Sequence, residues 1–198
     1  MPDSSPPKPS SMTRSSGPAI TSASSVPAGD KAAATRKVHF VLQGKGGIGK
    51  TFAASLLAQF YREQQSPVVC LDTDPVNGSF SAIHALGASH VELLHGDKID
   101  VDALDDMVER VIGEDANFVV DNGAASFLPL SRYLVEHDIA GLIADGGKRV
   151  IVHTILTGGP AMLDTAKALD AIIEQFPASV GVVVWLNVFW SRRHPDRR

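Results

Sequence analysis

The chain alternates short apolar runs with longer stretches in which apolar residues recur every three or four positions. The runs are typical of buried strands and cover residues 38–42, 67–71, 117–121, 149–155 and 180–186. Helical spacing predicts helices over residues 51–64, 101–113, 128–137 and 161–176. Strands that alternate with helices predict an α/β fold of three layers, in which helices cover both faces of a mostly parallel sheet.

The helical stripes and the weaker runs give further expectations. We expect two stripes to face the core: Phe52, Leu56, Leu57 and Phe60 in the first helix, and Met162, Leu163, Ala166, Leu169, Ile173 and Phe176 in the last. The run 180–186 is continuously apolar, as expected of a parallel strand that is covered on both faces. Residues 79–86 predict a short helix, residues 90–100 an irregular segment, and residues 139–144 a short strand.

The two ends of the chain differ from its middle. Residues 1–36 are rich in Ser, Pro and Ala without hydrophobic periodicity, so we expect them to be disordered. An organelle transit segment, and a start site at Met12, are alternative interpretations of this stretch. The folded domain is expected over residues 37–190. A basic tail follows at 191–198 without strand or helix pattern, so we expect a fold shortened at its C-terminus.

Composition narrows the class of protein. The 198 residues are 44% hydrophobic, enough for one domain with a core, and no apolar run approaches a membrane span. The net charge is −4, with basic ends and an acidic body, which argues against a broad DNA-binding face. The single cysteine, Cys70, excludes a disulfide framework within the chain. We expect a cytoplasmic protein.

A glycine-rich loop between the first strand and the first helix matches the pattern G-x-x-x-x-G-K-[ST] over residues 44–51. Glycines let such a loop curl with its N–H groups inward, and the helix that follows adds unpaired N–H groups and a positive dipole end. Lys50 would reach the β- and γ-phosphates of a nucleotide, and the Thr51 hydroxyl would bind Mg²⁺. The nucleotide-binding set is Gly44, Lys45, Gly46, Gly47, Ile48, Gly49, Lys50 and Thr51.

Carboxylates follow two of the predicted strands. Asp72 and Asp74 come at the end of the second strand, and Asp121 ends the third in the manner of a Walker B aspartate. Asn187 ends the last strand. Because the carboxyl ends of parallel strands share one edge of the sheet, we expect all of these residues to converge on the glycine loop at a single nucleotide site.

With its second lysine, Lys45, the loop reads K-G-G-I-G-K-T and resembles the deviant phosphate loop of the ParA/MinD-type ATPases. A narrower resemblance is to the TraL conjugal-transfer family. It runs from about residue 37 to 190 and rests on segments 38–51, 72–77, 119–131, 152–159 and 183–187. It implies a P-loop NTPase fold of the ParA-like class. It also implies a slow ATPase that forms a nucleotide-dependent homodimer and serves conjugative plasmid transfer with components of the transfer machinery.

The resemblance also implies roles for single residues. Lys45 would cross a dimer interface to the partner's nucleotide, as an arginine finger does. Asp72 and Asp121 would hold Mg²⁺ through water, and Asp74 would position the attacking water. Asn187 would hydrogen-bond the adenine edge. The catalytic set is then Lys45, Lys50 and Asp74, the metal set is Thr51, Asp72 and Asp121, and the cofactors are ATP and Mg²⁺.

Two departures from the family pattern leave alternatives open. Asn122-Gly123-Ala124 stands where partition ATPases often carry Thr-Pro or Pro-Pro, and the family normally continues beyond the strand that ends at Asn187. The alternatives are a ParA-type partition ATPase and a nucleotide-binding interaction protein without turnover. A small-molecule or nucleotide kinase that uses the same loop is disfavoured by Lys45. No serine lies in a G-x-S-x-G setting, which argues against a serine hydrolase.

Overall fold

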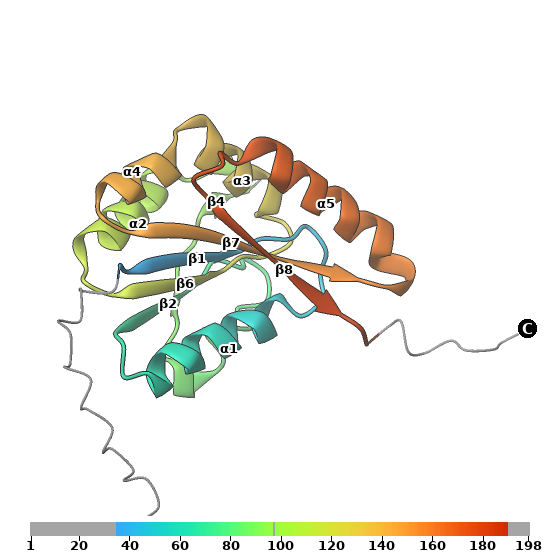
Figure 1. The fold of residues 1–198 in the computed structure, drawn as a ribbon, viewed down its shortest axis with the longest axis horizontal. Coiled ribbons are helices and arrows are strands. Elements are labelled where there is room, and N and C mark those ends of the chain that lie inside the picture. The colour runs from blue at the N-terminus through green and yellow to red at the C-terminus, as the bar shows by residue number, and fades with distance from the viewer. Residues whose placement is uncertain (1–34, 97, 190–198) are drawn as a thin grey trace, which may run out of the picture. The chain divides into compact units, whose positions relative to one another are not determined.

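The computed structural model describes residues 35–96 and 98–189, which form an α/β domain around one parallel sheet (Figure 1). The six strands lie in the order β3-β2-β6-β1-β7-β8, and every pairing in this sheet is parallel. Their bounds are β1 Lys37–Val41, β2 Val68–Asp72, β3 Ser89–His90, β6 Asn117–Asp121, β7 Arg149–Thr157 and β8 Gly181–Asn187. A separate antiparallel pair joins β4 (Leu94–His95) to β5 (Lys98–Ile99).

Helices cover the two faces of the sheet unequally. Within residues 35–96 and 98–189, the only α-helix on one face is α1 (Lys50–Glu63), whereas the other face carries α2 (Val101–Gly113), α3 (Phe127–Glu136), α4 (Ile139–Asp145) and α5 (Met162–Gln175) (Figure 1). Two 3₁₀ turns lie at His84–Leu86 and Gly159–Ala161. The predicted three-layer α/β class is therefore confirmed. The terminal segments expected over 1–36 and 191–198 fall almost wholly outside the described residues.

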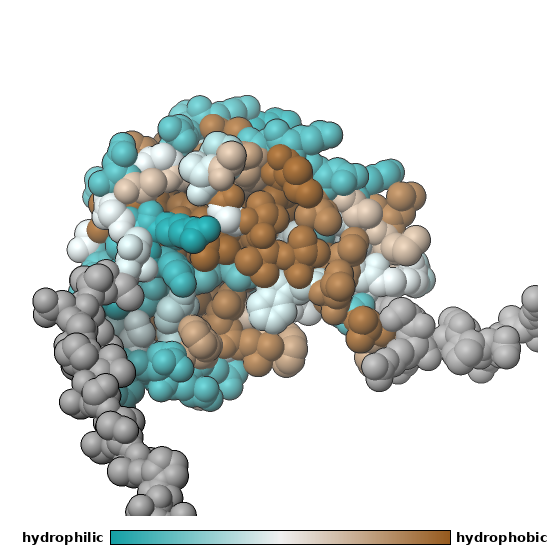
Figure 2. All heavy atoms as spheres, viewed as in Figure 1, coloured by the Kyte–Doolittle hydropathy of each residue, from teal (hydrophilic) through white to brown (hydrophobic). Residues whose placement is uncertain are grey.

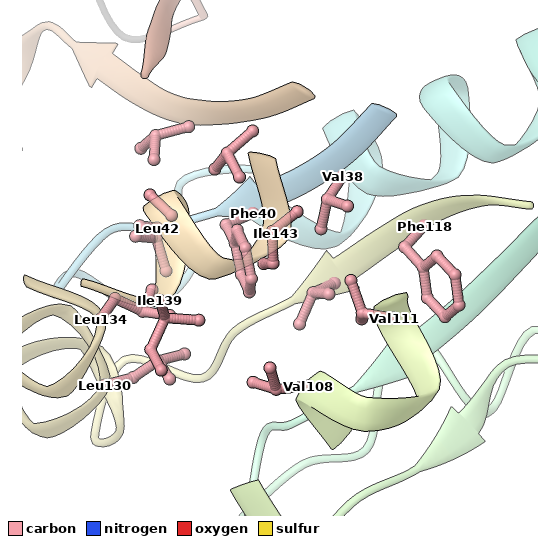
Figure 3. Packing of buried hydrophobic residues seen from close by; sticks show 14 of the residues in the cluster. Val38, Phe40, Leu42, Val108, Val111, Phe118, Leu130, Leu134, Ile139 and Ile143 are labelled. Atoms are coloured by element: carbon pink, nitrogen blue, oxygen red, sulfur yellow. The ribbon is translucent and has the colours of Figure 1, made fainter. Parts of the chain in front are cut away.

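The larger core lies between the sheet and the four-helix face. Phe40 and Phe118 project from neighbouring strands and are almost wholly buried, and Val108, Val111, Leu130 and Ile143 reach them from α2, α3 and α4 (Figure 3). A smaller cluster lies under α1. Both cores stiffen the central strands, whose carboxyl ends carry the loops of the candidate site.

Several local predictions are wrong, and each has a physical reason. Residues 139–144 form part of helix α4 and not a strand. The Asp138 side chain accepts a hydrogen bond from the Gly141 N–H and so begins the helix. A short apolar run has no period long enough to separate a strand from a helix. The helix expected over 79–86 shrinks to the turn at His84–Leu86.

The apolar stripes predicted for α1 and α5 are only partly right. Phe176 is buried in the larger core and Leu57 packs, partly buried, against the smaller one, but other members of the stripes lie on the surface. Phe52 (68% exposed), Phe60 (54%), Met162 (58%) and Leu163 (61%) face outward. The two helices approach the sheet through small residues instead, chiefly Ala53, Ala54, Ala58, Thr165 and Ala168. Small side chains let a helix lie close to a sheet, so large apolar residues on the opposite side are left as surface.

Strand β8 is an edge strand and is not covered on both faces as expected. Val182, Val183 and Val184 are each more than one third exposed, and Leu186 is 69% exposed. Figure 2 shows apolar atoms gathered over this strand. The described part of the chain thus presents an apolar edge strand alongside β7.

Candidate functional site

The glycine loop leaves the sheet at the carboxyl end of β1 and leads into α1, which begins at Lys50. Gly47 (φ 71°) and Gly49 (φ 105°) adopt left-handed backbone conformations, which L side chains rarely take. The first N–H groups of a helix have no partner within it, so the start of α1 offers donors to an anion. The loop therefore has the glycine-dependent backbone and the helix start that the motif predicts, and its binding of phosphate stays a prediction.

Lys50 is turned back onto its own loop. Its Nζ donates a hydrogen bond to the Lys45 carbonyl oxygen at 2.9 Å, and the residue is only 9% exposed. Burial lowers the pKa of Lys50, while the carboxylates of Asp121 and Asp74 act in the opposite direction. A buried cation with a single carbonyl partner is well placed to exchange that carbonyl for a phosphate oxygen.

Thr51 and Asp121 form a contact between the start of α1 and the end of β6. The Thr51 hydroxyl donates to Asp121 Oδ2 at 2.6 Å, whereas Asp121 Oδ1 is buried without a hydrogen-bond partner. Burial raises the pKa of Asp121 to about 6. An unpartnered carboxylate oxygen beside a hydroxyl fits the oxygen-ligand chemistry of Mg²⁺. Among the described residues no group of three or more His, Cys, Asp or Glu side chains could hold a metal ion.

The carboxylates of Asp72 and Asp74 accept hydrogen bonds from different parts of the loop that follows β2. Asp72 is wholly buried, and its two oxygens accept hydrogen bonds from the backbone N–H groups of Asp74, Phe80 and Ser81. Asp74 Oδ1 accepts from the N–H groups of Val76 and Asn77. Asp74 lines a cavity of about 470 Å³ together with Lys50, Thr51 and Asp121. In this geometry Asp72 organises the loop, and its predicted contact with Mg²⁺ remains a prediction.

Lys45 projects from the opposite side of the loop, toward α5. Its Nζ lies 3.2 Å from Asp164 Oδ2, and both side chains are about half exposed. An exposed ion pair of this kind contributes little to stability, about 0–1 kcal/mol. The pair is therefore weak enough for a competing phosphate to separate, and the trans-acting role of Lys45 stays a prediction.

Asn187 lies at the end of β8, beside the loop. Its Nδ2 donates to the Ile48 carbonyl oxygen at 2.9 Å, and its Oδ1 accepts from the Phe189 N–H. Asn187 also lines an apolar cavity of about 630 Å³ with Phe52, Trp185 and others. The amide thus links β8 to the glycine loop, and its predicted contact with adenine is not tested by this geometry.

Sequence reasoning missed two buried polar groups near the site. One joins Thr73, Asn122 and Ser126 below the cavity. The other is a chain of hydrogen bonds through Trp185, His153, His39 and Tyr61. Both histidines are buried. Because His39 and His153 occupy alternate positions on adjacent strands, the strand order would have been needed to bring them together.

No protein-family model matches the chain. Two Escherichia coli proteins, each called Protein TraL, are 41% identical to it over 155 residues, which make up 78% of this chain and 64% of each relative. The chain is related to TraL. The resemblance to the TraL family is thus confirmed, and the chain spans less than two thirds of the length of these TraL proteins.

Two solved structures are similar to this chain at low sequence identity. One is a plasmid partition protein from Borrelia burgdorferi, with a TM-score of 0.49 and 14% identity, covering 80% of this chain and 82% of that one. The other is the signal recognition particle receptor FtsY from Elizabethkingia anophelis, with a TM-score of 0.49 and 18% identity, covering 76% of this chain and 49% of that one. In the described residues, no helix is long and apolar enough to cross a membrane.

Proposed function

We propose that the chain is a Mg²⁺-dependent ATPase that hydrolyses ATP slowly, forms a homodimer when ATP is bound, and serves conjugative plasmid transfer with components of the transfer machinery. The observation that carries the enzymatic part is the single cavity lined by Lys50, Thr51, Asp74 and Asp121. The buried, unpartnered oxygen of Asp121 supports a cation in that cavity. The relation to TraL supports the part in conjugation.

Each residue has a defined task in this proposal. The loop N–H groups and the start of α1 bind phosphate oxygens, and Lys50 exchanges the Lys45 carbonyl for the β- and γ-phosphates. Thr51 and Asp121 would hold Mg²⁺, which would supply positive charge to neutralise the phosphates. Asp74 accepts a hydrogen bond from the attacking water and orients it. Catalysis is then mainly positioning and charge stabilisation, as is general for phosphoryl transfer.

The test begins with ATP binding and hydrolysis by the purified protein in the presence of Mg²⁺. Lys50→Ala should weaken ATP binding about 30-fold or more, because a charged contact to phosphate is lost. Asp74→Asn should retain binding and lose turnover. Lys98→Ala removes an exposed lysine of β5 and should match the wild type. Equal ATP affinity of wild type and Lys50→Ala would contradict the site.

Dimerisation is tested separately by measuring the mass of the particle in solution with and without ATP. The wild type should double its mass with ATP, and Lys45→Ala should stay monomeric while it still binds ATP. An ATP-dependent dimer of unchanged strength in Lys45→Ala would refute the trans-acting role. Binding of ATP without turnover or dimerisation would instead identify a nucleotide-binding interaction protein.

A further inference from the structure

Two loops meet below the candidate phosphate site, one after β2 and one after β6. The loop after β2 carries Asp74 and is pinned at both ends by the Asp72 carboxylate, which accepts from the N–H groups of Asp74, Phe80 and Ser81. Because these three amides are spread over eight residues, one buried side chain fixes both the start and the end of the loop. This leaves the position of the loop as a whole to be set by its other contacts.

The loop after β6 supplies such contacts through Asn122 and Ser126. The bond of Asn122 to Thr73, and the bond that the Ser126 hydroxyl donates to the Thr73 carbonyl oxygen at 3.3 Å, join the two loops. The bonds of Asn122 to Ser126 and Gly123 lie within the loop after β6. Asn122 Oδ1 accepts from the Thr73 hydroxyl at 3.2 Å and from the Ser126 hydroxyl at 2.7 Å, while its Nδ2 donates to the Gly123 carbonyl oxygen at 3.0 Å. Thr73, Asn122 and Ser126 are each at most 1% exposed. A buried amide in such a network is costly to leave unpaired, so the two loops are held in one relative position.

The backbone of Gly123 lies directly against Asp74, with no room for a side chain between them. A Cβ added at this glycine would lie 2.8 Å from Asp74 Oδ1 and 2.9 Å from Asp74 Cα, distances that carbon atoms in proteins essentially never show. The Gly123 backbone is not in the left-handed region, so the absence of a side chain serves this contact and not an unusual conformation. A larger residue would have to push Asp74 away from its place in the cavity.

We propose that Asn122 and Gly123 are positioning residues that lock the loop of Asp74 to the loop that follows Asp121. This rests on the proposed ATPase function, in which Asp74 orients water and Asp121 holds Mg²⁺. The lock makes these two carboxylates a single unit, because Asp74 cannot move without disturbing the residues directly after Asp121. It also gives a physical role to the Asn-Gly sequence that departs from the pattern of partition ATPases.

The test compares Gly123→Ala with Gly113→Ala, a control at the end of α2 where an added Cβ meets no atom within 4 Å. Gly123→Ala should lower kcat for ATP about 100-fold, the loss expected when a positioned group shifts by about 1 Å. Its dissociation constant for ATP should stay within about twofold of wild type, since the phosphate loop is untouched. Gly113→Ala should leave both values unchanged. A kcat for Gly123→Ala equal to that of the control would overturn the proposal.

A second pair of variants tests the hydrogen-bonded part of the lock without ATP. Amide hydrogen exchange is followed by mass spectrometry in peptides covering residues 74–81. Thr73→Val removes the hydroxyl and should speed exchange there about tenfold, whereas Thr73→Ser keeps the hydroxyl and should restore protection. Equal exchange in both variants and the wild type would overturn the lock. If the wild type neither binds nor hydrolyses ATP, the proposed function fails, but this exchange measurement still decides whether the loops are locked.

Discussion

Acid should destabilise this protein through the buried histidine pair. Trp185 Nε1–H donates to His153 Nδ1 at 2.9 Å, so His153 carries its proton on Nε2 and donates to His39 Nδ1 at 2.7 Å. His39 then donates from Nε2 to the Tyr61 hydroxyl oxygen at 2.7 Å. Both rings are neutral in this chain, and a further proton on either ring would set two donors against each other.

The sign of the effect follows from the pKa values of the two rings. Burial lowers the pKa of His39 to about 3 and that of His153 to about 4. An exposed histidine titrates near pH ~6.5, so the unfolded chain takes up protons first as the pH falls. The stability that the neutral histidines contribute is therefore fully present above pH ~6.5. It is lost progressively as the pH falls toward their pKa values in the folded state. Between pH 7 and 5 each histidine should cost about 2 kcal/mol, and the pair about 4 kcal/mol.

Asp121 acts in the opposite direction and has to be separated from the histidines. Burial raises the pKa of Asp121 to about 6, so the folded state binds this proton more readily than the unfolded state. When the pH falls from 7 to 5, protonation of Asp121 should therefore raise the free energy of unfolding by about 1 kcal/mol. This contribution is the same in the wild type and in histidine variants, so it cancels when their pH dependences are subtracted.

The assay is urea unfolding at pH 7 and pH 5 without nucleotide. The double variant His39→Gln/His153→Gln keeps polar groups in the chain but cannot titrate, so its loss of stability between the two pH values should be about 4 kcal/mol smaller than that of the wild type. His90→Gln replaces an exposed histidine and should behave as the wild type. An identical pH dependence in the double variant and the wild type would refute the reasoning.

Three further predictions concern single positions. Lys148→Met should lower the unfolding free energy in urea by about 3 kcal/mol, because the buried Lys148 ammonium donates to the Val111 and Glu114 carbonyl oxygens at the end of α2; a loss below about 0.5 kcal/mol would contradict this role. Gly49→Ala should cost about 1–3 kcal/mol from its φ of 105° and weaken ATP binding measured by calorimetry. Asp121→Asn should raise the melting temperature without nucleotide at pH 7, since burial makes the charged carboxylate unfavourable, yet abolish Mg²⁺-dependent hydrolysis. An unchanged melting temperature would show that the buried carboxylate carries no such cost.

The sequence allowed the alternation of strands and helices and the convergence of loops at one sheet edge to be predicted, because the glycine motif and long apolar runs carry strong periodic signals. It could not locate the inward faces of α1 and α5. Those faces are built from small residues such as Ala54 and Ala168, and small residues are weak signals in a hydrophobic pattern. The contacts of Asn122 and Gly123 were missed for a different reason. They are made to residues that follow another strand, and such partners can be identified only once the strand order is known.

The exposed edge strand β8 has a consequence for handling the protein. Its sequence from Gly181 to Asn187 is apolar and β-branched, without charge or proline, which is the composition of segments that self-associate as extended strands. Asn187 and Trp185 tie this strand to the glycine loop and to the histidine chain. A substitution that removes these hydrogen bonds would release an aggregation-prone strand. The variant protein would then precipitate before a loss of nucleotide binding or hydrolysis could be measured.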